Sequence, residues 1–352
     1  MAGSISLKAV TAAGISVLAA AVAQPLEDPM QRRPAHHTEH GFRNPDGGPE
    51  HSDAPLSVTL PFFARRVAAS IAGRADADSA PPRLANDGTF VRENALGSVP
   101  TVTWIGHSTL LVQMGHVTFL TDPTWSRTAS PVAVGPRRFV DPGVAFEDLP
   151  KIDFALVSHN HYDHMDLATL ERLAEKGTQI FVPLGNAAIL EGIAGVTELD
   201  WWEEQRFDGV SIHCVPARHW SRRGVADVNR SLWSGWVVVA DDRRFYFAGD
   251  TGTFAGFAEI GRRLGPFDLA AMPIGAYEPR AMMAPSHINP EEAIGALAGL
   301  AAKRSVAIHY GTFDLSDEPI DDPPRRFLAA SAAAGRGPDR DWVLAVGETR
   351  VW

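Results

Sequence analysis

Short apolar runs broken by turn residues recur from about Ser98 to the C-terminus. Runs of about four to eight apolar residues between Gly, Pro, Asn or Asp are typical of buried strands. The pattern predicts strands at Val102–Ile105, Leu110–Gln113, Val117–Leu120, Phe154–Val157, Ile180–Pro183, Glu198–Trp202, Val210–Val215, Leu232–Ala240, Arg244–Ala248, Leu269–Ile274, Ser305–Ile308 and Trp342–Val346. Three helices are predicted among them, over Asp166–Lys176, Asn186–Ile193 and Asn289–Ala302. The last has Asn289 as a good N-cap and a proline at its first position.

Polar side chains with metal-binding capacity follow several of these strands. His159 and His161 lie two residues apart after Phe154–Val157, so an extended chain would present them on one face. Asp163 and His164 follow where the chain must turn into a helix. Four such side chains in a His-x-His-x-Asp-His pattern would be costly to bury without partners. This stretch therefore predicts half of a site for two metal ions.

Three further strands end in the same kinds of residue, namely His219, Asp250 and His309. Binding groups gather at strand ends, where the scaffold is rigid and the backbone is free. Imidazole nitrogens and carboxylate oxygens without a thiolate suit Zn²⁺, and Mn²⁺ or iron would tolerate the same set. Two such ions roughly 3.5–4 Å apart can share a hydroxide and stabilise the oxygens of an in-line displacement.

Composition narrows the class of protein. The 352 residues are 45% hydrophobic and 21% charged, as in an ordinary soluble domain. The net charge of −10 argues against a nucleic-acid partner, which would need clustered positive charge. Cys214 is the only cysteine, so no intrachain disulfide can form, and its apolar surroundings favour a buried position.

Residues 1–95 differ in composition from the rest of the chain. Residues 1–23 have the weakly positive start, apolar run and small-residue end of a signal peptide, and a helical extension is the alternative. A periplasmic or otherwise exported protein, either free or membrane-associated, is therefore expected, or a cytoplasmic one if no signal is present. Residues 24–95 are rich in Pro, Asp, Gly and Arg, which predicts a poorly ordered extension before a domain at 96–352. A helix at Pro61–Arg74 would pack on this domain or lie against lipid headgroups.

At the histidine and aspartate motifs the chain resembles the metallo-β-lactamase superfamily. Within it, the chain is similar to the N-acylphosphatidylethanolamine-hydrolysing phospholipase D family. The stretches that carry this resemblance include Thr103–Thr109, Thr121–Pro123, Ser158–His164, Asp200–Glu204, Phe245–Gly252, Gly265–Arg280 and Ile308–Phe313. The resemblance implies an α/β fold, a four-layer αβ/βα sandwich with two metal ions at one edge.

The resemblance also implies roles for single residues. His159, His161 and His219 would hold one zinc ion, Asp163, His164 and His309 the other, and Asp250 would bridge them. Asp163 would also take part in catalysis. His287 matches a family histidine beside the scissile phosphate and is the candidate donor to the leaving group, or it packs ahead of Asn289. Tyr162 and Tyr277 are candidate substrate contacts, and His107 is expected to support the ligands.

The resemblance implies a zinc-dependent phosphodiesterase acting on phospholipid at a membrane surface. It would use a hydroxide between the metals to cleave N-acylphosphatidylethanolamine into an N-acylethanolamine and phosphatidate. Alternatives are a lactonase or phosphodiesterase for a small soluble substrate, a nuclease, or a metal-dependent membrane-binding protein without turnover. A homodimer is compatible with the sequence, which does not decide the oligomeric state.

Overall fold

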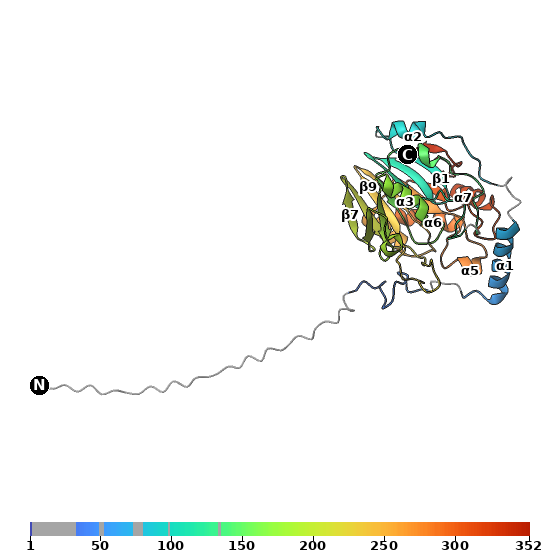
Figure 1. Ribbon diagram of the computed structural model, residues 1–352, viewed down its shortest axis with the longest axis horizontal. Coiled ribbons are helices and arrows are strands. Elements are labelled where there is room, and N and C mark those ends of the chain that lie inside the picture. Colours follow the sequence, from blue (N-terminus) through green and yellow to red (C-terminus); the bar gives the residue numbers. More distant parts are fainter. Residues whose placement is uncertain (2–32, 49–52, 73–79, 98, 133–134) are drawn as a thin grey trace. The chain divides into compact units, whose positions relative to one another are not determined.

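The computed structural model of the chain describes Met1 and residues 33–352 apart from 49–52, 73–79, 98 and 133–134 (Figure 1). The chain divides into residues 1–34 and a compact unit from Ala35 to Trp352, which contains all the elements below. The predicted signal peptide at 1–23 lies outside the described residues except for Met1, so export stays a prediction.

Two seven-stranded sheets form the centre of this unit. The first has the order β14-β1-β2-β3-β4-β5-β6, and the second has the order β13-β12-β11-β10-β9-β8-β7. The first contains β1 (Thr101–Gly106), β2 (Thr109–Met114), β3 (Val117–Thr121), β4 (Phe154–Leu156), β5 (Gln179–Pro183), β6 (Val196–Leu199) and β14 (Thr349–Val351). The second contains β7 (Glu204–Phe207), β8 (Val210–Val215), β9 (Gly235–Ala240), β10 (Arg243–Phe247), β11 (Leu269–Pro273), β12 (Arg304–Ile308) and β13 (Asp341–Trp342). In each sheet four neighbouring strands run parallel, from β3 to β6 and from β10 to β13.

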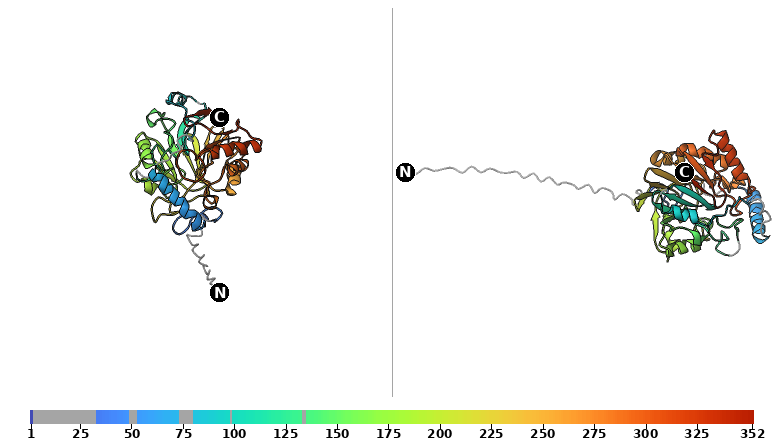
Figure 2. Two further views of the ribbon diagram at one scale, coloured as in Figure 1. Left: turned by 90° about the vertical axis from the view of Figure 1, so that its right-hand side faces the viewer. Right: turned by 90° about the horizontal axis from the view of Figure 1, so that it is seen from above.

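Helices cover the outer faces of both sheets, as the view from above shows (Figure 2). The helices of the unit are α1 (Leu56–Ala72), α2 (Thr89–Asn94), α3 (Leu167–Glu175), α4 (Gly256–Leu264), α5 (Arg280–Met283), α6 (Pro290–Leu300) and α7 (Asp322–Ala333), with short 3₁₀ turns at Phe146–Asp148 and Ala187–Leu190. Val91 of α2 and Leu173 of α3 pack with residues of the first sheet. Leu297 of α6 and Phe327 of α7 belong to the main core cluster, which contains buried residues of the second sheet together with residues of the first. The predicted α/β sandwich of four layers is thereby confirmed.

Aromatic residues join the two sheets. Phe119 of β3 stacks on Phe154 of β4 with ring centroids 4.8 Å apart, and it meets Phe245 of β10 edge-on at 5.7 Å. The Trp236 indole of β9 donates a hydrogen bond of 2.9 Å to the carbonyl of Val157, which directly follows β4 of the other sheet. Val157 lies two residues before His159. The packing between the sheets therefore fixes the strand end that carries the histidine motif.

The predicted strands are largely confirmed, with two exceptions. The expected strand Glu198–Trp202 does not form, because β6 ends at Leu199 and the chain turns at Trp202, which has φ of 73°, before β7 begins at Glu204. The expected strand Trp342–Val346 is replaced by the short β13 and, after a turn at Gly347, by β14. β14 pairs with β1 of the first sheet, so the chain changes sheets within this stretch. Helices α4 and α7 were not predicted. Helix α4 has only nine residues, two of them glycines, and α7 is charged and alanine-rich with a weak apolar period.

Much of the N-terminal region packs on the domain. Phe42 and Phe62 are buried, and α1 extends over Leu56–Ala72 where a helix at Pro61–Arg74 was predicted. Poor order within 24–95 stays a prediction for the residues outside the described ranges. Within the described part of the chain, no helix combines the length and the apolar character needed to span a bilayer.

A buried ion pair anchors the sheet edge beside β12, the strand that leads to His309. Asp341 of β13 is fully buried and accepts hydrogen bonds from Ser305 of β12 at 2.7 Å and from Ser331 of α7 at 2.6 Å. Arg336 binds both oxygens of the same carboxylate, at 2.8 and 2.9 Å. The carboxylate thus holds a strand, a helix and a loop together.

We expect Asp341→Ala to lower the free energy of unfolding by about 3 kcal/mol, because it leaves the partly buried Arg336 charge and two hydroxyl groups without their acceptor. Guanidinium denaturation followed by circular dichroism measures this change. The matched control is Asp339→Ala, two residues away and exposed. Equal stability of the two variants would show that the buried pair contributes little.

Candidate metal centre

The predicted ligands come from the ends of four strands at one edge of the two sheets. His159 and His161 follow β4, and His219 follows β8. Asp250 follows β10, and His309 directly follows β12. Because β3 and β4 are parallel in one sheet and β10, β11 and β12 in the other, their carboxyl ends meet at a common edge.

Three histidines form the first half of the centre. The Nδ1 atom of His161 lies 2.8 Å from Nε2 of His159 and 3.3 Å from Nε2 of His219. The rings meet nearly edge to face, with interplanar angles of 74–82°. One nitrogen of each ring therefore points to a common position, as three ligands of one metal ion would.

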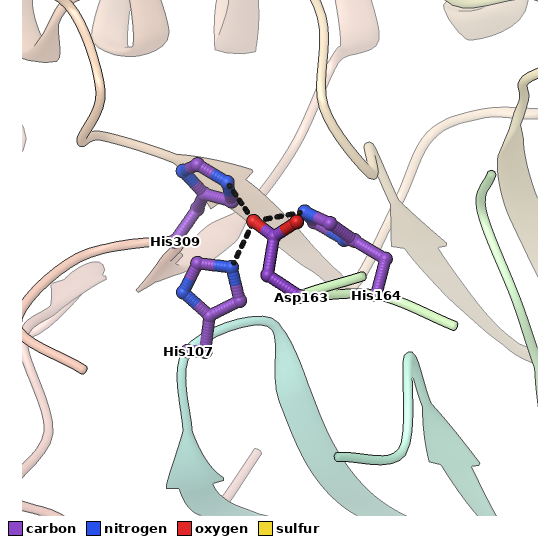
Figure 3. Close-up of side chains that lie close together, drawn as sticks. All are labelled: His107, Asp163, His164 and His309. Carbon is purple, nitrogen blue, oxygen red and sulfur yellow. Dashed lines mark hydrogen bonds and ion pairs between the residues drawn. The ribbon is translucent and has the colours of Figure 1, made fainter. Parts of the chain in front are cut away.

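The second half lies beside it (Figure 3). The Asp163 carboxylate points between His164 and His309, with Oδ2 at 3.3 Å and 3.6 Å from their Nε2 atoms. His107, from the turn between β1 and β2, approaches the same oxygen to 3.1 Å. One atom from each of these four residues falls in a group that could hold an ion.

Asp250 connects the two halves. Its Oδ2 atom lies 3.0 Å from Nε2 of His309 and 3.2 Å from Nε2 of His164. It also lies 3.8 Å from Nε2 of His219 and 4.0 Å from Nε2 of His159. The structure thus brings all seven predicted ligands together, with one carboxylate oxygen between the two groups.

Several polar atoms of this cluster lack a hydrogen bond of normal geometry. Among the described residues, these buried atoms include Nε2 of His164, both ring nitrogens of His309 and Oδ1 of Asp250. A buried polar atom left without a partner costs about 1–3 kcal/mol. Atoms that converge without bonding to one another fit a cluster completed by cations. The donor set is imidazole and carboxylate, which suits two divalent transition-metal ions.

Electrostatics divides the histidines into two groups. Burial lowers the pKa of His159 and His219 well below the usual range and that of His161 to about 4, which keeps the first half neutral. Burial also opposes charge on His309, but Asp250 and Asp163 raise its pKa to about 9. Burial also opposes charge on His164, but Asp250, Asp163 and Asp122 raise the pKa of this histidine well above its usual value. Without a cation, protons on the second half therefore balance the buried carboxylates.

The outer nitrogens of the ligands are held by partners that fix the ring orientation. Nδ1 of His164 donates to Oδ2 of Asp122 at 2.6 Å, and Nδ1 of His219 donates to the Ser286 carbonyl at 3.0 Å. Asp122 also accepts from the Ser158 hydroxyl at 2.7 Å and from its backbone N–H at 2.6 Å. Partners of this kind leave the Nε2 lone pair facing the metal position.

The sequence interpretation missed Asp122 as part of this site. The residue lies just after β3, is fully buried and has φ of 34°. The signal was the aspartate at a strand end in Thr121-Asp-Pro123, next in the sheet to the strand that carries the histidine motif. His107 was expected to support the ligands, and its contact with Asp163 has the geometry for that role.

The other predicted site residues lie at different distances from the metal cluster. Nδ1 of His287 lies 3.8 Å from Oδ2 of Asp250, so His287 borders the cluster, and burial lowers its pKa to about 4. Tyr162 lies on the histidine turn, where its hydroxyl donates to the Arg223 carbonyl at 2.8 Å. Tyr277 is fully buried, but it is not brought to the cluster, because its hydroxyl bonds to Asp322 of α7.

Comparison with protein families and relatives agrees with this geometry. Residues 117–310 match the family described as beta-lactamase superfamily domain. The chain is 47% identical over 228 residues to N-acyl-phosphatidylethanolamine-hydrolyzing phospholipase D 1 of Caenorhabditis elegans, covering 60% of this chain and 64% of that protein. It is 35% identical over 275 residues to the mitochondrial enzyme of the same name from Saccharomyces cerevisiae, covering 75% of this chain and 58% of that protein. The match thus spans less than two thirds of each relative.

Solved structures share the fold. Igni18, a metallo hydrolase from Ignicoccus hospitalis, aligns with a TM-score of 0.56 at 24% identity, over 72% of this chain and 99% of that one. An isothiocyanate hydrolase from Delia radicum gut bacteria aligns with a TM-score of 0.57 at 23% identity, with the same coverage. At this level of identity, the likeness concerns the fold alone.

We expect Asp122→Asn to weaken metal binding in the second half about 10–100-fold, as is usual when a partner of a metal-binding histidine is lost. Both oxygens of Asp122 accept hydrogen bonds, so either orientation of an asparagine amide would turn an N–H toward a donor. Competition with a chromophoric chelator measures the affinity. The control is Asp153→Asn at the start of β4, which accepts from the Thr118 N–H away from the cluster. Unchanged affinity in Asp122→Asn would contradict its role.

Proposed function

The chain belongs to the metallo-β-lactamase superfamily, and from this premise we propose that it is a zinc-dependent hydrolase acting on the phosphodiester of N-acylated ethanolamine phospholipids. The observation that carries the hydrolase proposal is Oδ2 of Asp250, which lies 3.0–4.0 Å from Nε2 atoms of histidines in both halves of the cluster. A carboxylate oxygen in this position favours two ions that share a ligand.

The residues fit two zinc ions. His159, His161 and His219 would hold one, and Asp163, His164 and His309 the other, with Asp250 shared. When bound, such a pair lowers the pKa of a water molecule toward neutrality and stabilises charge on phosphoryl oxygens. The low pKa values of His159, His161 and His219 support this assignment, because a metal ligand must be a neutral imidazole.

His287 is the group of this chain best placed to act on the leaving oxygen. Its pKa of about 4, lowered mainly by burial, keeps the ring neutral near pH 7. A neutral imidazole still has one N–H, which can donate a hydrogen bond to the oxygen that leaves phosphorus. Arg280 fixes the residue's backbone, because it donates to the His287 carbonyl at 2.9 Å while its other nitrogen binds Glu292 of α6. We therefore assign His287 a donor role through a hydrogen bond.

The lipid substrate is supported by the names of two relatives and by the surroundings of the cluster. A cavity borders His107 and His309, and its lining includes apolar and polar residues of the loop after β12, among them Phe313, Leu315, Ser316, Glu318 and Ile320. Helix α1 is fixed to this loop, since Arg65 pairs with Asp317 and Arg66 donates to the Ser316 carbonyl at 2.8 Å. The cavity and the helix therefore lie on the same side of the centre.

Helix α1 presents an apolar stripe to solvent. Leu56, Leu60, Phe63 and Val67 follow one face of the helix at helical spacing, and their exposed fractions are 71%, 63%, 55% and 59%. Exposed apolar residues on one helix face, with arginines at its flank, are typical of a helix that lies in a lipid interface. We infer that α1 brings the cavity to a membrane surface.

We expect the purified, zinc-loaded protein to convert N-acylphosphatidylethanolamine and water into an N-acylethanolamine and phosphatidate. Metal analysis, together with mass spectrometry of both products, provides the measurement. Asp250→Ala should lose at least about a hundredfold in turnover, since the shared ligand of the two ions is gone. Chelation should abolish turnover, and zinc should restore it.

Three outcomes would revise this function. Equal product from Asp250→Ala would identify a contaminant as the source. Turnover of a short lactone or a soluble phosphodiester without turnover of the lipid would favour the alternative of a small soluble substrate. Vesicle binding without any product would favour a binding protein.

We expect Leu60→Asp combined with Phe63→Asp to reduce turnover of substrate in vesicles at least about tenfold. Burying one leucine or phenylalanine side chain in an apolar phase stabilises the membrane-bound state by about 1.5–3 kcal/mol, and the two aspartates remove this contribution. Turnover of a short-chain soluble analogue should stay unchanged, which separates membrane docking from catalysis. Leu96→Asp, at a leucine that is 93% exposed beyond α2, is the matched control. Equal loss in this control would argue for a nonspecific effect.

A further inference from the structure

A second group of metal-binding side chains lies outside the cluster around Asp250. His36 and His37 belong to a segment at residues 35–48, called here the N-terminal segment. They meet Asp200, which directly follows β6. One donor atom from each of the three residues lies within 4.8 Å of the others. None of the three has a place in the proposed reaction.

The contacts in this group converge on one carboxylate. Nε2 of His36 lies 2.6 Å from Oδ1 of Asp200, and Nε2 of His37 lies 2.6 Å from Oδ2. The two consecutive rings are turned 75° from each other, and their Nε2 atoms face the two oxygens of this one carboxylate. The side chains are 9%, 18% and 13% exposed in the order His36, His37 and Asp200, which limits competition from water.

The three side chains are held in place from behind. The His36 ring stacks on Trp201 with centroids 4.2 Å apart, and the His37 ring meets Phe42 edge-on at 5.1 Å. The backbone N–H of Trp201 donates to Oδ1 of Asp200 at 2.7 Å. Metal ligands are usually oriented by outer contacts of this kind, and the position of the metal is thereby prepared.

We propose that His36, His37 and Asp200 form a third metal site, which binds Zn²⁺ or a similar divalent transition-metal ion. Two imidazoles and a carboxylate are a common zinc donor set, and water completes the fourth position. Each imidazole binds through Nε2 with its proton on Nδ1. The ion takes the place between the rings and the carboxylate that the direct hydrogen bonds occupy without it.

This site ties the N-terminal segment to the turn between β6 and β7. The segment also reaches the catalytic cluster, because Oδ1 of Asn44 accepts a hydrogen bond of 3.0 Å from the backbone N–H of His219. The Phe42 N–H donates to the Asn229 carbonyl at 2.8 Å, and Phe42 packs in the main core. The third ion therefore stabilises a segment that supports one of the catalytic ligands.

The experiment compares zinc content in the full-length chain and in the His36→Gln/His37→Gln double variant. After zinc loading and removal of loosely bound metal, elemental analysis gives the zinc equivalents per chain. We expect the double variant to hold one equivalent less than the wild type. His40→Gln is the matched control, because His40 lies in the same segment and its side chain is 83% exposed. This control should hold as much zinc as the wild type.

Asp200→Asn provides a second variant in case the double variant fails to fold. Its amide has the shape of the carboxylate but lacks the charge, so it should also lose one equivalent. Substitution with Co²⁺ adds a spectroscopic test, since the variant spectrum should lack the contribution of one tetrahedral ion. Wild-type zinc content in a folded double variant, or in Asp200→Asn, would overturn the proposal and identify a hydrogen-bonded clamp without metal. This difference of one equivalent does not depend on the identity of the substrate.

Discussion

The buried carboxylate of Asp250 among four imidazole nitrogens is the constraint on which the rest of this structure depends. Its Oδ2 atom is 3.0 Å from one histidine nitrogen and 4.0 Å from another, and its Oδ1 atom has no partner among the described residues. An unsatisfied charge of this kind is costly in a protein interior. Protons on His164 and His309 offset part of the cost without metal, and two divalent cations would offset more. The cluster is therefore stable only in a fold that holds both halves at the same edge.

The two sheets meet this requirement by different means. In the first sheet, Asp122 links the end of β3 to the histidine turn through Ser158 and His164. In the second sheet, parallel pairing from β10 through β11 to β12 places Asp250 and His309 at the same edge, where their side chains approach to 3.0 Å. The Trp236 indole joins the sheets at Val157, two residues before His159. Because ligands come from both sheets, metal binding and the packing between the sheets stabilise each other.

The sequence predicts the parts of this arrangement that are local. Apolar runs mark the strands, and the histidine motif lies within six residues, so the fold class and the predicted ligands follow from patterns along the chain. Asp122 and the contact of His107 with Asp163 could not be predicted in this way, because they depend on which strands become neighbours. The same reason applies to Tyr277, whose hydroxyl bonds to a helix 45 residues away. The same reason applies most strongly to His36 and His37. Their sequence surroundings are those of solvated residues, and only the fold shows that both contact Asp200.

The metal cluster and the choice of substrate depend on different parts of the chain. Solved structures with this fold at 23–24% identity include a metallo hydrolase and an isothiocyanate hydrolase, so the scaffold does not determine the reaction. What can select a substrate here is the loop after β12 and the region around His287, which border the cluster without belonging to it, together with helix α1, which is attached to that loop. Arg65 and Arg66 fix α1 to that loop, and Arg280 fixes His287 to α6. A change of substrate would therefore need changes in these contacts, while the ligands and Asp122 could remain as they are.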